Sequence, residues 1–235
     1  MNASRTARER VRAELTGEIK DVARRQLAAE GASGLSLRAV ARELGMVSSA
    51  IYRYFPSRDD LLTALITEAF DAVGEAAEAA DASCPKDRHL DRWMAVCRAF
   101  RTWALAHPHE YALIHGTPVP GYIAPQETAV AAARDGVVLA TILRDAQEAG
   151  ALTPRLTGFP PTPESFVPDA DRLRETLFAP FPDDVILAAL MAWTQLYGAI
   201  SFELFGMYHN VLETPADTFD HTALTQAHLL GLTRD

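Results

Sequence analysis

The chain has 235 residues, of which 49% are hydrophobic and 23% charged, and its formal net charge at pH 7 is −9. Such a balance supports a buried core and excludes disordered and fibrous proteins. The two cysteines, Cys84 and Cys97, are too few for a disulfide framework and lack zinc-site spacing. No uninterrupted apolar run approaches the roughly 20 residues of a membrane helix, and the N-terminus lacks a signal peptide's apolar region, so we expect a cytoplasmic protein with no membrane partner.

The net charge is unevenly distributed along the chain. Residues 1–58 contain eleven Lys and Arg against six Asp and Glu, a net charge of +5, and the remainder carries −14. A basic region followed by an acidic one is expected where one end meets phosphate groups and the other has a different task.

In chain order, the first predicted elements are three helices. Apolar residues at helical spacing predict a helix over about 8–29, which the glycines of "EGASG" end. A short second helix follows its cap Ser36 and ends at Gly45, where a left-handed residue without a Cβ is favoured. A third helix covers 48–55, because Pro56 cannot continue it.

The remaining predicted elements are also helical. Ser57 and Asp60 form a capping box that begins a long fourth helix. Further helices are predicted over residues 88–107, 108–116, 125–150, 183–208 and 216–230. Between them, residues 153–182 form a proline-rich loop, which we expect to be disordered or loosely draped, with a functional lid as the alternative. No run shows the period of a strand, so the predicted fold class is all-α.

The two short helices around Gly45 predict a helix-turn-helix. The second helix of this motif lies in the major groove of DNA and offers its exposed face to the bases. Serine hydroxyls suit phosphates and base amines, an arginine suits guanine, and a tyrosine hydroxyl suits phosphate. The side chains left facing outward are Ser48, Ser49, Tyr52 and Arg53. For Tyr52 and Tyr54, the alternative is a core ring with its polar tip at the surface.

The segment "GLSLRAVARELGMVSSAIYRYFPSRDDLLTAL", preceded by a basic helix, closely resembles the DNA-binding domain of the tetracycline-repressor (TetR) family of transcription regulators. The resemblance covers about the first seventy residues. Val47 departs from it, since a small capping residue is common there. The resemblance implies base and phosphate contacts by Ser48, Ser49, Tyr52, Arg53 and Tyr54, a phosphate grip by Arg58, and backbone contacts by Ser36 and Arg38.

Two later segments, "WALAHPHEYALIHG" and "WTQLYGAISFELFG", resemble a pair found in one subgroup of these regulators, which has a Trp-His-Gly type motif. Here Tyr197 and Gly198 stand at the His-Gly positions. In the family this region is a helical ligand pocket and a homodimerisation module. The candidate ligand-binding residues are Trp103, His107, Tyr111, His115, Trp193 and Tyr197. The alternative is that these helix-spaced aromatic residues are ordinary core.

Other site chemistries are not supported by the sequence. His107, His109, Glu110 and His115 invite a metal interpretation, but Pro108 breaks the helix within this group and no further ligand has diagnostic spacing. No nucleophile and base are suitably arranged. We therefore expect no metal, no cofactor and no catalytic residues.

These features predict three parts of the chain: a helix-turn-helix domain over 1–56, a connecting helix over 57–80, and a larger helical ligand-binding and dimerisation domain over 81–235. The predicted function is a homodimeric regulator of transcription. As a repressor, it would leave a palindromic double-stranded operator when an unknown small-molecule inducer binds, with its last two helices forming the dimer surface. The alternatives are a ligand-independent DNA-binding protein with a collapsed pocket, or a helical small-molecule enzyme.

Overall fold

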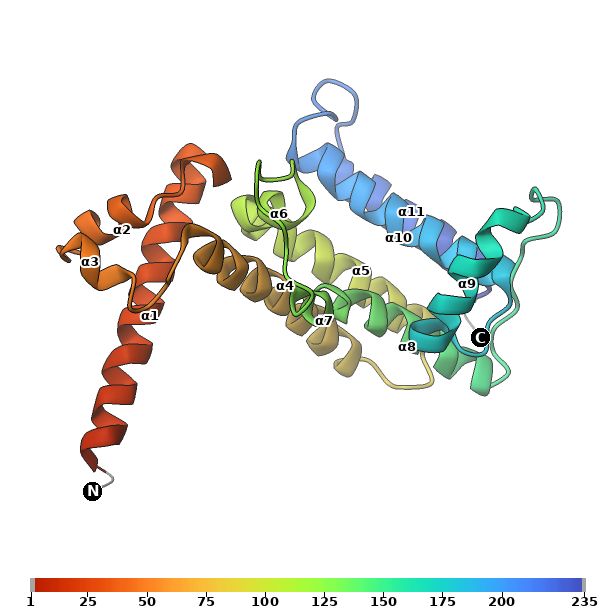
Figure 1. Cartoon of the computed structure of the whole chain (residues 1–235). Coiled ribbons are helices and arrows are strands. Elements are labelled where there is room, and N and C mark those ends of the chain that lie inside the picture. The colour runs from red at the N-terminus through yellow and green to blue at the C-terminus, as the bar shows by residue number, and fades with distance from the viewer. Residues whose placement is uncertain (1–2, 234–235) are drawn as a thin grey trace. The chain divides into compact units, whose positions relative to one another are not determined.

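A computed structural model describes residues 3–233, and every regular element in that range is helical, which confirms the predicted all-α class (Figure 1). The contacts between the helices divide the chain into two units. The first unit comprises Met1–Phe70 and His107–Ala131, and the second comprises Asp71–Ala106 and Ala132–Asp235. The division follows packing rather than chain order, because the segment after residue 106 packs with the N-terminal helices.

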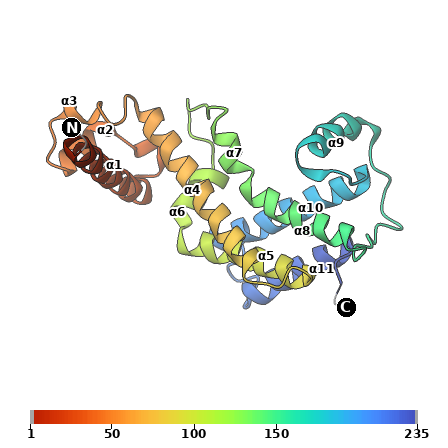
Figure 2. The same cartoon turned by 90° about the horizontal axis from the view of Figure 1, so that it is seen from below.

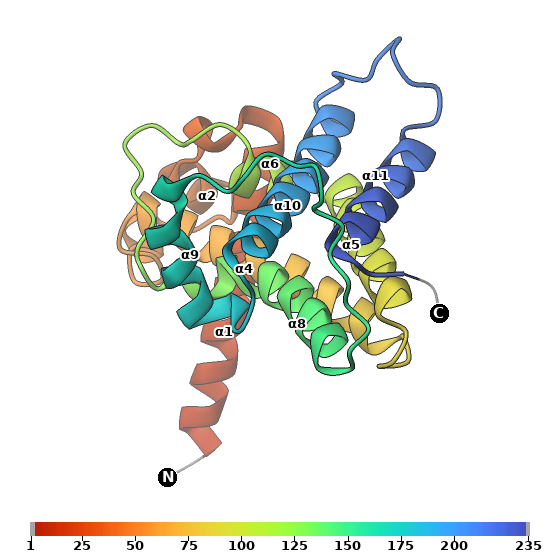
Figure 3. The same cartoon turned by 90° about the vertical axis from the view of Figure 1, so that its right-hand side faces the viewer.

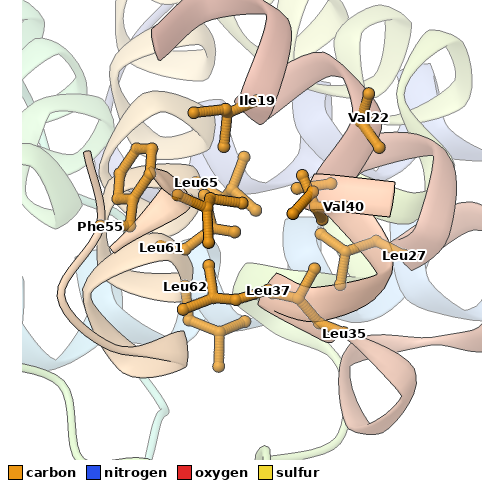
Figure 4. Close-up of a cluster of buried hydrophobic side chains, with 13 residues drawn as sticks. Ile19, Val22, Leu27, Leu35, Leu37, Val40, Phe55, Leu61, Leu62 and Leu65 are labelled. Atoms are coloured by element: carbon orange, nitrogen blue, oxygen red, sulfur yellow. The ribbon is translucent and has the colours of Figure 1, made fainter. Parts of the chain in front are cut away.

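The first unit has a single apolar cluster at its centre (Figure 4). Its helices are α1 (Ala3–Glu30), α2 (Leu37–Glu43), α3 (Ser48–Ile51), the beginning of α4 (Arg58–Ala82) and α6 (Pro108–His115), with a 3-10 turn η1 (Ala32–Gly34) after α1. Ile19, Val40 and Ile51, from three different helices, are completely buried in the cluster. Helices as short as α2 and α3 are unstable alone, so this burial holds them in place.

The turn between α2 and α3 forms as the local sequence predicts. The Ser36 hydroxyl caps α2 by accepting a hydrogen bond from the amide of Ala39 at 3.4 Å. Gly45 adopts the left-handed conformation, with φ of 66°. The amide of Met46 then donates to the carbonyl of Ala41 at 2.8 Å and closes the end of α2.

The third helix is shorter than the predicted 48–55. Regular α-helix ends at Ile51, and turn residues follow as far as Tyr54. Val47 occupies the N-cap position, where its side chain provides no hydrogen bond. With neither a polar cap nor a continuation past Pro56, α3 depends on the burial of Ile51 and Phe55.

The two side chains of the predicted capping box pair at the beginning of α4, with the Asp60 carboxylate on the Ser57 hydroxyl rather than on the Ser57 amide. The amide of Asp60 donates to the Ser57 hydroxyl oxygen at 3.1 Å, and that hydroxyl donates to the Asp60 carboxylate at 2.7 Å.

The second unit consists of helices packed around α5 (His89–Ala106), which contacts α8 (Arg134–Glu148), α10 (Asp183–Leu204) and α11 (Pro215–Leu230). Helices α10 and α11 lie side by side in two views (Figures 1 and 3). Trp93 of α5 is buried between them and donates its indole N–H to the carbonyl of Ala223 at 3.1 Å. A buried tryptophan whose N–H is satisfied fixes the distance between α5 and α11.

A buried arginine joins α5 to α4 and α8. Arg92 has no solvent exposure, and its guanidinium donates to Asp81 at 2.6 Å and to Asp145 of α8 at 2.8 Å. Burial acts to raise the pKa of Asp81, but hydrogen bonds from Arg92 and Lys86 outweigh it and hold that pKa below its ordinary value. The cluster is therefore a charged, fully paired part of the core.

The predicted helix over 125–150 is interrupted. It forms as α7 (Thr128–Ala132) and α8, with the break at Ala133. The carboxylate of Asp135 accepts a hydrogen bond from the amide of Gly136 at 2.7 Å, a bond available only at the beginning of a helix, where amides have no carbonyl partner.

The proline-rich loop predicted over 153–182 contains helical structure that the sequence did not reveal. The 3-10 turn η2 (Glu164–Phe166), α9 (Val167–Leu173) and the π-helical turn η3 (Arg174–Phe178) follow one another, and α9 packs against α10 (Figure 2). Pro168 lies in the first turn of α9, where a missing N–H costs nothing. Proline marks the beginning of a helix here.

The irregular part before η2 is attached to the end of α11. The amides of Thr153 and Arg155 donate to the carbonyls of Gly231 and Leu229, at 3.3 and 2.9 Å. Gly231 has φ of 95°, and a Cβ there would lie 2.2 Å from the carbonyl carbon of Thr153. The segment around Thr153 therefore lies along the end of α11, and glycine is required at position 231, where the two backbones cross.

Helix α10 is long and apolar enough, by length and composition, to cross a membrane, with a mean hydropathy of 1.6 over its best window. The same properties describe a central core helix. Its contacts with α5, α9 and α11 bury residues such as Ile186, Ala192 and Ile200, which is consistent with a role in the core.

Candidate nucleic-acid interface and apolar cavity

The face of α3 predicted to point outward is exposed. Ser48, Ser49, Tyr52 and Arg53 are all accessible, and Tyr52 has 43% of its surface exposed, whereas Ile51 is buried. Tyr52 is therefore not a core residue. Hydroxyls and a guanidinium on one exposed helix face are donors and acceptors suited to phosphates and base edges.

Tyr54 is placed differently from Tyr52. It is half-buried, packs against the apolar cluster, and has the guanidinium carbon of Arg12 5.6 Å from its ring centroid. The Arg12 guanidinium also donates to the carbonyl of Arg53 at 3.1 Å. Tyr54 thus attaches α1 to the end of α3.

The N-terminal part of α1 contributes residues that the sequence interpretation did not assign to the interface. Arg8 and Arg12, with Ala7 and Val11, line a shallow surface hollow together with Arg53 and Tyr54. Arg8 and Arg12 are one helical turn apart and therefore lie on the same side of α1. This spacing would have indicated two interface residues if the side of α1 that packs beside α3 had been known.

Arg58, for which the family resemblance implies a phosphate grip, has its guanidinium directed at the backbone. It donates to the carbonyl of Ala32 at 2.7 Å and to that of Leu35 at 3.2 Å. These bonds hold η1 and the beginning of α2 against α4. Ser36 and Arg38 lie at this same end of α2, where Ser36 is partly exposed and Arg38 fully so.

Two groups of arginines in the first unit differ in their partners. Those on the far part of α1 are paired with carboxylates: Arg24 contacts Glu68 and Glu110, and Arg25 contacts Glu43. Among the described residues, a second group has no carboxylate within ion-pair distance: Arg8, Arg12, Arg38, Arg42 and Arg53. The positive charge of this second group is available for a polyanion.

The six predicted ligand residues fall into both units. Trp193 and Tyr197 lie together on α10, with ring centroids 5.4 Å apart, and Trp103 is buried in α5. In the first unit, Tyr111 is buried against His115, with ring centroids 4.9 Å apart, and the Nδ1 of exposed His107 lies 2.8 Å from Glu110. No group of residues suited to a metal ion occurs in the part of the chain that the structure describes.

An apolar cavity of about 170 Å³ lies within the second unit, between α5, α8, η3 and α10. Of the six predicted ligand-binding residues, Trp193 lines this cavity. Most of its wall consists of alanine and leucine side chains with the rings of Trp93, Phe178 and Trp193. Asp135 contributes the single charged side chain among the described residues that line it.

The Asp135 carboxylate is buried, with 5% of the residue's surface exposed, and is held by neutral donors. One oxygen accepts from the Tyr197 hydroxyl at 2.5 Å and from the indole N–H of Trp193 at 3.4 Å, while the other accepts from the amide of Gly136. The sequence interpretation missed Asp135 because an acid near the beginning of a helix is an ordinary N-terminal residue.

Comparisons with known proteins agree over most of the chain. A model described as bacterial regulatory proteins, tetR family, matches residues 19–65, and one described as tetracyclin repressor-like, C-terminal domain, matches residues 93–225. The HTH-type transcriptional regulator Rv1816 of Mycobacterium tuberculosis is 42% identical over 220 residues, 92% of this chain and 90% of the relative.

Solved structures share the fold. The crystal structure of SCO4313 has a TM-score of 0.76 and 33% identity, and the match covers 94% of this chain and 98% of that one. A tetR-family regulator from Rhodococcus RHA1 has a TM-score of 0.63 and 22% identity, covering 93% and 98%. RolR in complex with resorcinol has a TM-score of 0.54 and 16% identity, covering 96% and 91%.

The second family model alone spans more than half of the chain, and the curated relative matches nine-tenths of it. These relatives are regulators of transcription rather than enzymes. The chain belongs to the TetR family of DNA-binding transcriptional regulators.

Proposed function

We propose that the protein is a homodimeric repressor that leaves a palindromic operator when a small molecule binds in its second unit. The observation that carries the proposal is the exposed face of α3, flanked by arginines without carboxylate partners. Ser48, Ser49 and Arg53 contact bases, and the Tyr52 hydroxyl contacts phosphate. Such a regulator acts in the cytoplasm, where its DNA is.

The surrounding residues contact or position the DNA backbone. Arg8, Arg12, Arg38 and Ser36 are the proposed phosphate contacts around α3. We assign Tyr54 and Arg58 to positioning instead, because their side chains are engaged with Arg12 and with the carbonyls after α1. This assignment replaces the phosphate grip that the family resemblance implies for Arg58.

The proposed dimer surface is one face of α10, with α11 beside it. Met191 and Phe202 of α10 and Phe205 after it are 54%, 52% and 47% exposed, and their spacing places them on one side of the helix with Gly198. Large apolar side chains gathered on an exposed face indicate a partner surface. Two-fold symmetry then places two copies of α3 roughly 34 to 36 Å, or a multiple of that, apart on DNA.

The ligand is proposed to occupy the cavity beside Trp193 and Asp135. Trp103, His107, Tyr111 and His115 lie outside its lining residues, so the earlier set of six narrows to Trp193, with Tyr197 acting through Asp135. RolR, which shares the fold, was solved with resorcinol, so one protein of this fold holds a ligand of one ring. Binding of inducer and of DNA would oppose each other by linkage.

The test is fluorescence anisotropy of a duplex taken from the region upstream of the protein's own gene, against a scrambled duplex, across a salt series. We expect tighter binding to the natural duplex and a steep salt dependence. Equal, weak binding to both duplexes would argue against an operator there.

Light scattering measures the mass in solution and tests the dimer. We expect a dimer for wild type and a monomer for Phe202→Asp. The control is Val130→Glu, which places a charge at an exposed apolar residue of α7 and should leave the dimer intact.

A further inference from the structure

We propose that the cavity of the second unit binds a small organic cation, an amine carried on a body of about one aromatic ring, with Asp135 as its counter-ion. Its regulatory consequence rests on the proposed function, but the binding does not. Three observations support the proposal: the lack of a protein cation beside the carboxylate, the orientation of the carboxylate, and the shape and polarity of the walls.

The first observation is a buried carboxylate without a cation. Among residues 3–233, no lysine, arginine or histidine nitrogen lies within ion-pair distance of Asp135, which is 5% exposed. Its neighbour Arg134 is directed elsewhere, to Asp71 at 2.6 Å and Glu78 at 2.8 Å. A buried charge is stable when a counter-charge accompanies it, so a cation entering the cavity gains an interaction that no protein side chain supplies.

The second observation is that the carboxylate is oriented but not neutralised. All three of its donors, the Tyr197 hydroxyl, the Trp193 indole and the Gly136 amide, are uncharged. They fix the position of both oxygens, and carboxylate oxygens have further lone pairs. A charge-assisted hydrogen bond from an ammonium group is stronger than one from a neutral group, so the site discriminates by charge.

The third observation is the apolar wall. Apart from Asp135, the described lining consists of alanine, glycine, leucine, phenylalanine and tryptophan side chains. A cavity of about 150 Å³ with such a lining holds benzene, and this one measures about 170 Å³. A single ring with a short aminoalkyl arm fits, and the indole rings of Trp93 and Trp193 in the wall can add attraction for a cation. Anions are repelled, and a polyamine would bury charges that have no partner.

The competing explanation is structural. Asp135 lies in the first turn of α8, where a carboxylate interacts favourably with the helix dipole. In that case Asp135 would only stabilise the beginning of α8, and the cavity would show no preference among ligands of different charge. The charge preference of the cavity separates the two explanations.

The experiment compares three ligands with the same ring and a short arm, namely 2-phenylethylamine, 2-phenylethanol and 3-phenylpropanoate, by calorimetry on the full-length protein at pH 7. We expect the amine to bind about tenfold or more tightly than the alcohol, and the propanoate to show no measurable binding. Equal affinity for amine and alcohol, or no binding of the amine up to millimolar concentration, overturns the proposal.

Two variants test whether Asp135 causes the preference for the amine over the alcohol. Asp135→Asn should lower amine affinity by about tenfold or more and leave alcohol affinity within about twofold, whereas Glu148→Gln, which removes an exposed charge from the same helix, should change neither. Loss of amine and alcohol binding alike in Asp135→Asn contradicts the proposed counter-ion. If that variant does not fold, the comparison of the three ligands on wild type still decides.

A separate measurement isolates the proposed function. Amine binding is followed by calorimetry without DNA, and DNA release by anisotropy with the operator. Amine binding that depends on Asp135 but does not release DNA would support the cation site and refute induction. Release of DNA by the alcohol at the same or a lower concentration than the amine would support induction and refute the cation site.

Discussion

The two units place their charges in opposite ways. The first unit leaves several arginines around α3 without carboxylates, although it contains acids that pair with other arginines of α1. The second unit pairs its buried arginine, Arg92, with two carboxylates and leaves one buried carboxylate, Asp135, with neutral donors. Paired charges hold elements together, and charges left without a protein partner mark the surfaces that meet ligands. Each prediction below tests this distinction.

The largest expected effect is on a paired charge. Arg92→Ala removes the fully buried guanidinium that Asp81 and Asp145 share, leaves Asp81 with Lys86 alone, and should lower the free energy of unfolding by about 3 to 5 kcal/mol, measured by urea denaturation. Arg98→Ala is the control, because its pair with Asp220 is exposed and should contribute at most about 1 kcal/mol. Similar losses in both variants would contradict the role assigned to burial.

The next effect concerns an unpaired charge. Arg53→Ala should weaken binding to the operator by about 1 to 3 kcal/mol and relax the base preference at one position of each half-site. The measurement is anisotropy on a set of singly substituted duplexes. An unchanged base preference would assign Arg53 to the DNA backbone.

Arg8 and Arg58 sharpen the comparison, because the first is unpaired and the second is bound to carbonyls. Arg8→Ala should weaken natural and scrambled duplexes about equally and reduce the salt slope by about one unit. Arg58→Ala should leave the salt slope unchanged. It should lower the free energy of unfolding by about 1 kcal/mol per lost hydrogen bond. A smaller salt slope in Arg58→Ala than in wild type would instead support the phosphate contact that the family resemblance implies for Arg58.

The smallest expected effect is a pH dependence of the paired cluster. Hydrogen bonds from Arg92 and Lys86 hold the pKa of Asp81 below its ordinary value, so the folded state favours the carboxylate. This stabilisation is fully present above the ordinary aspartate pKa of about 4 and is lost as the pH falls through the lower folded value. Thermal unfolding between pH 7 and pH 3 should show a smaller acid loss in Asp81→Asn than in wild type.

Features with local causes could be predicted from the sequence. The Ser36 cap, the turn at Gly45 and the Ser57–Asp60 capping box depend on residues within a few positions of each other, and all three are present in the structure. The all-α class and the exposed side of α3 follow from helical spacing. The shortness of α3 was missed, because Pro56 marks only the last point at which the helix can end and does not show that it ends earlier.

Features that depend on distant contacts could not be predicted. Helical spacing places Trp193 and Tyr111 on apolar faces, but it does not say which helix each face meets, and the two lie in different units. The direction of the Arg58 side chain depends on where the loop after α1 folds back. Asp135 becomes notable only when α8 and α10 bring a carboxylate, a phenol and an indole together.

The crossing at Gly231 bears on how substitutions will be tolerated along the chain. Here Gly231 has no room for a side chain against Thr153, and Leu232 is 1% exposed. In a comprehensive mutational scan, a sharp minimum of tolerance should therefore appear at Gly231 and Leu232, as deep as at the buried core positions and unlike the exposed loop after α10.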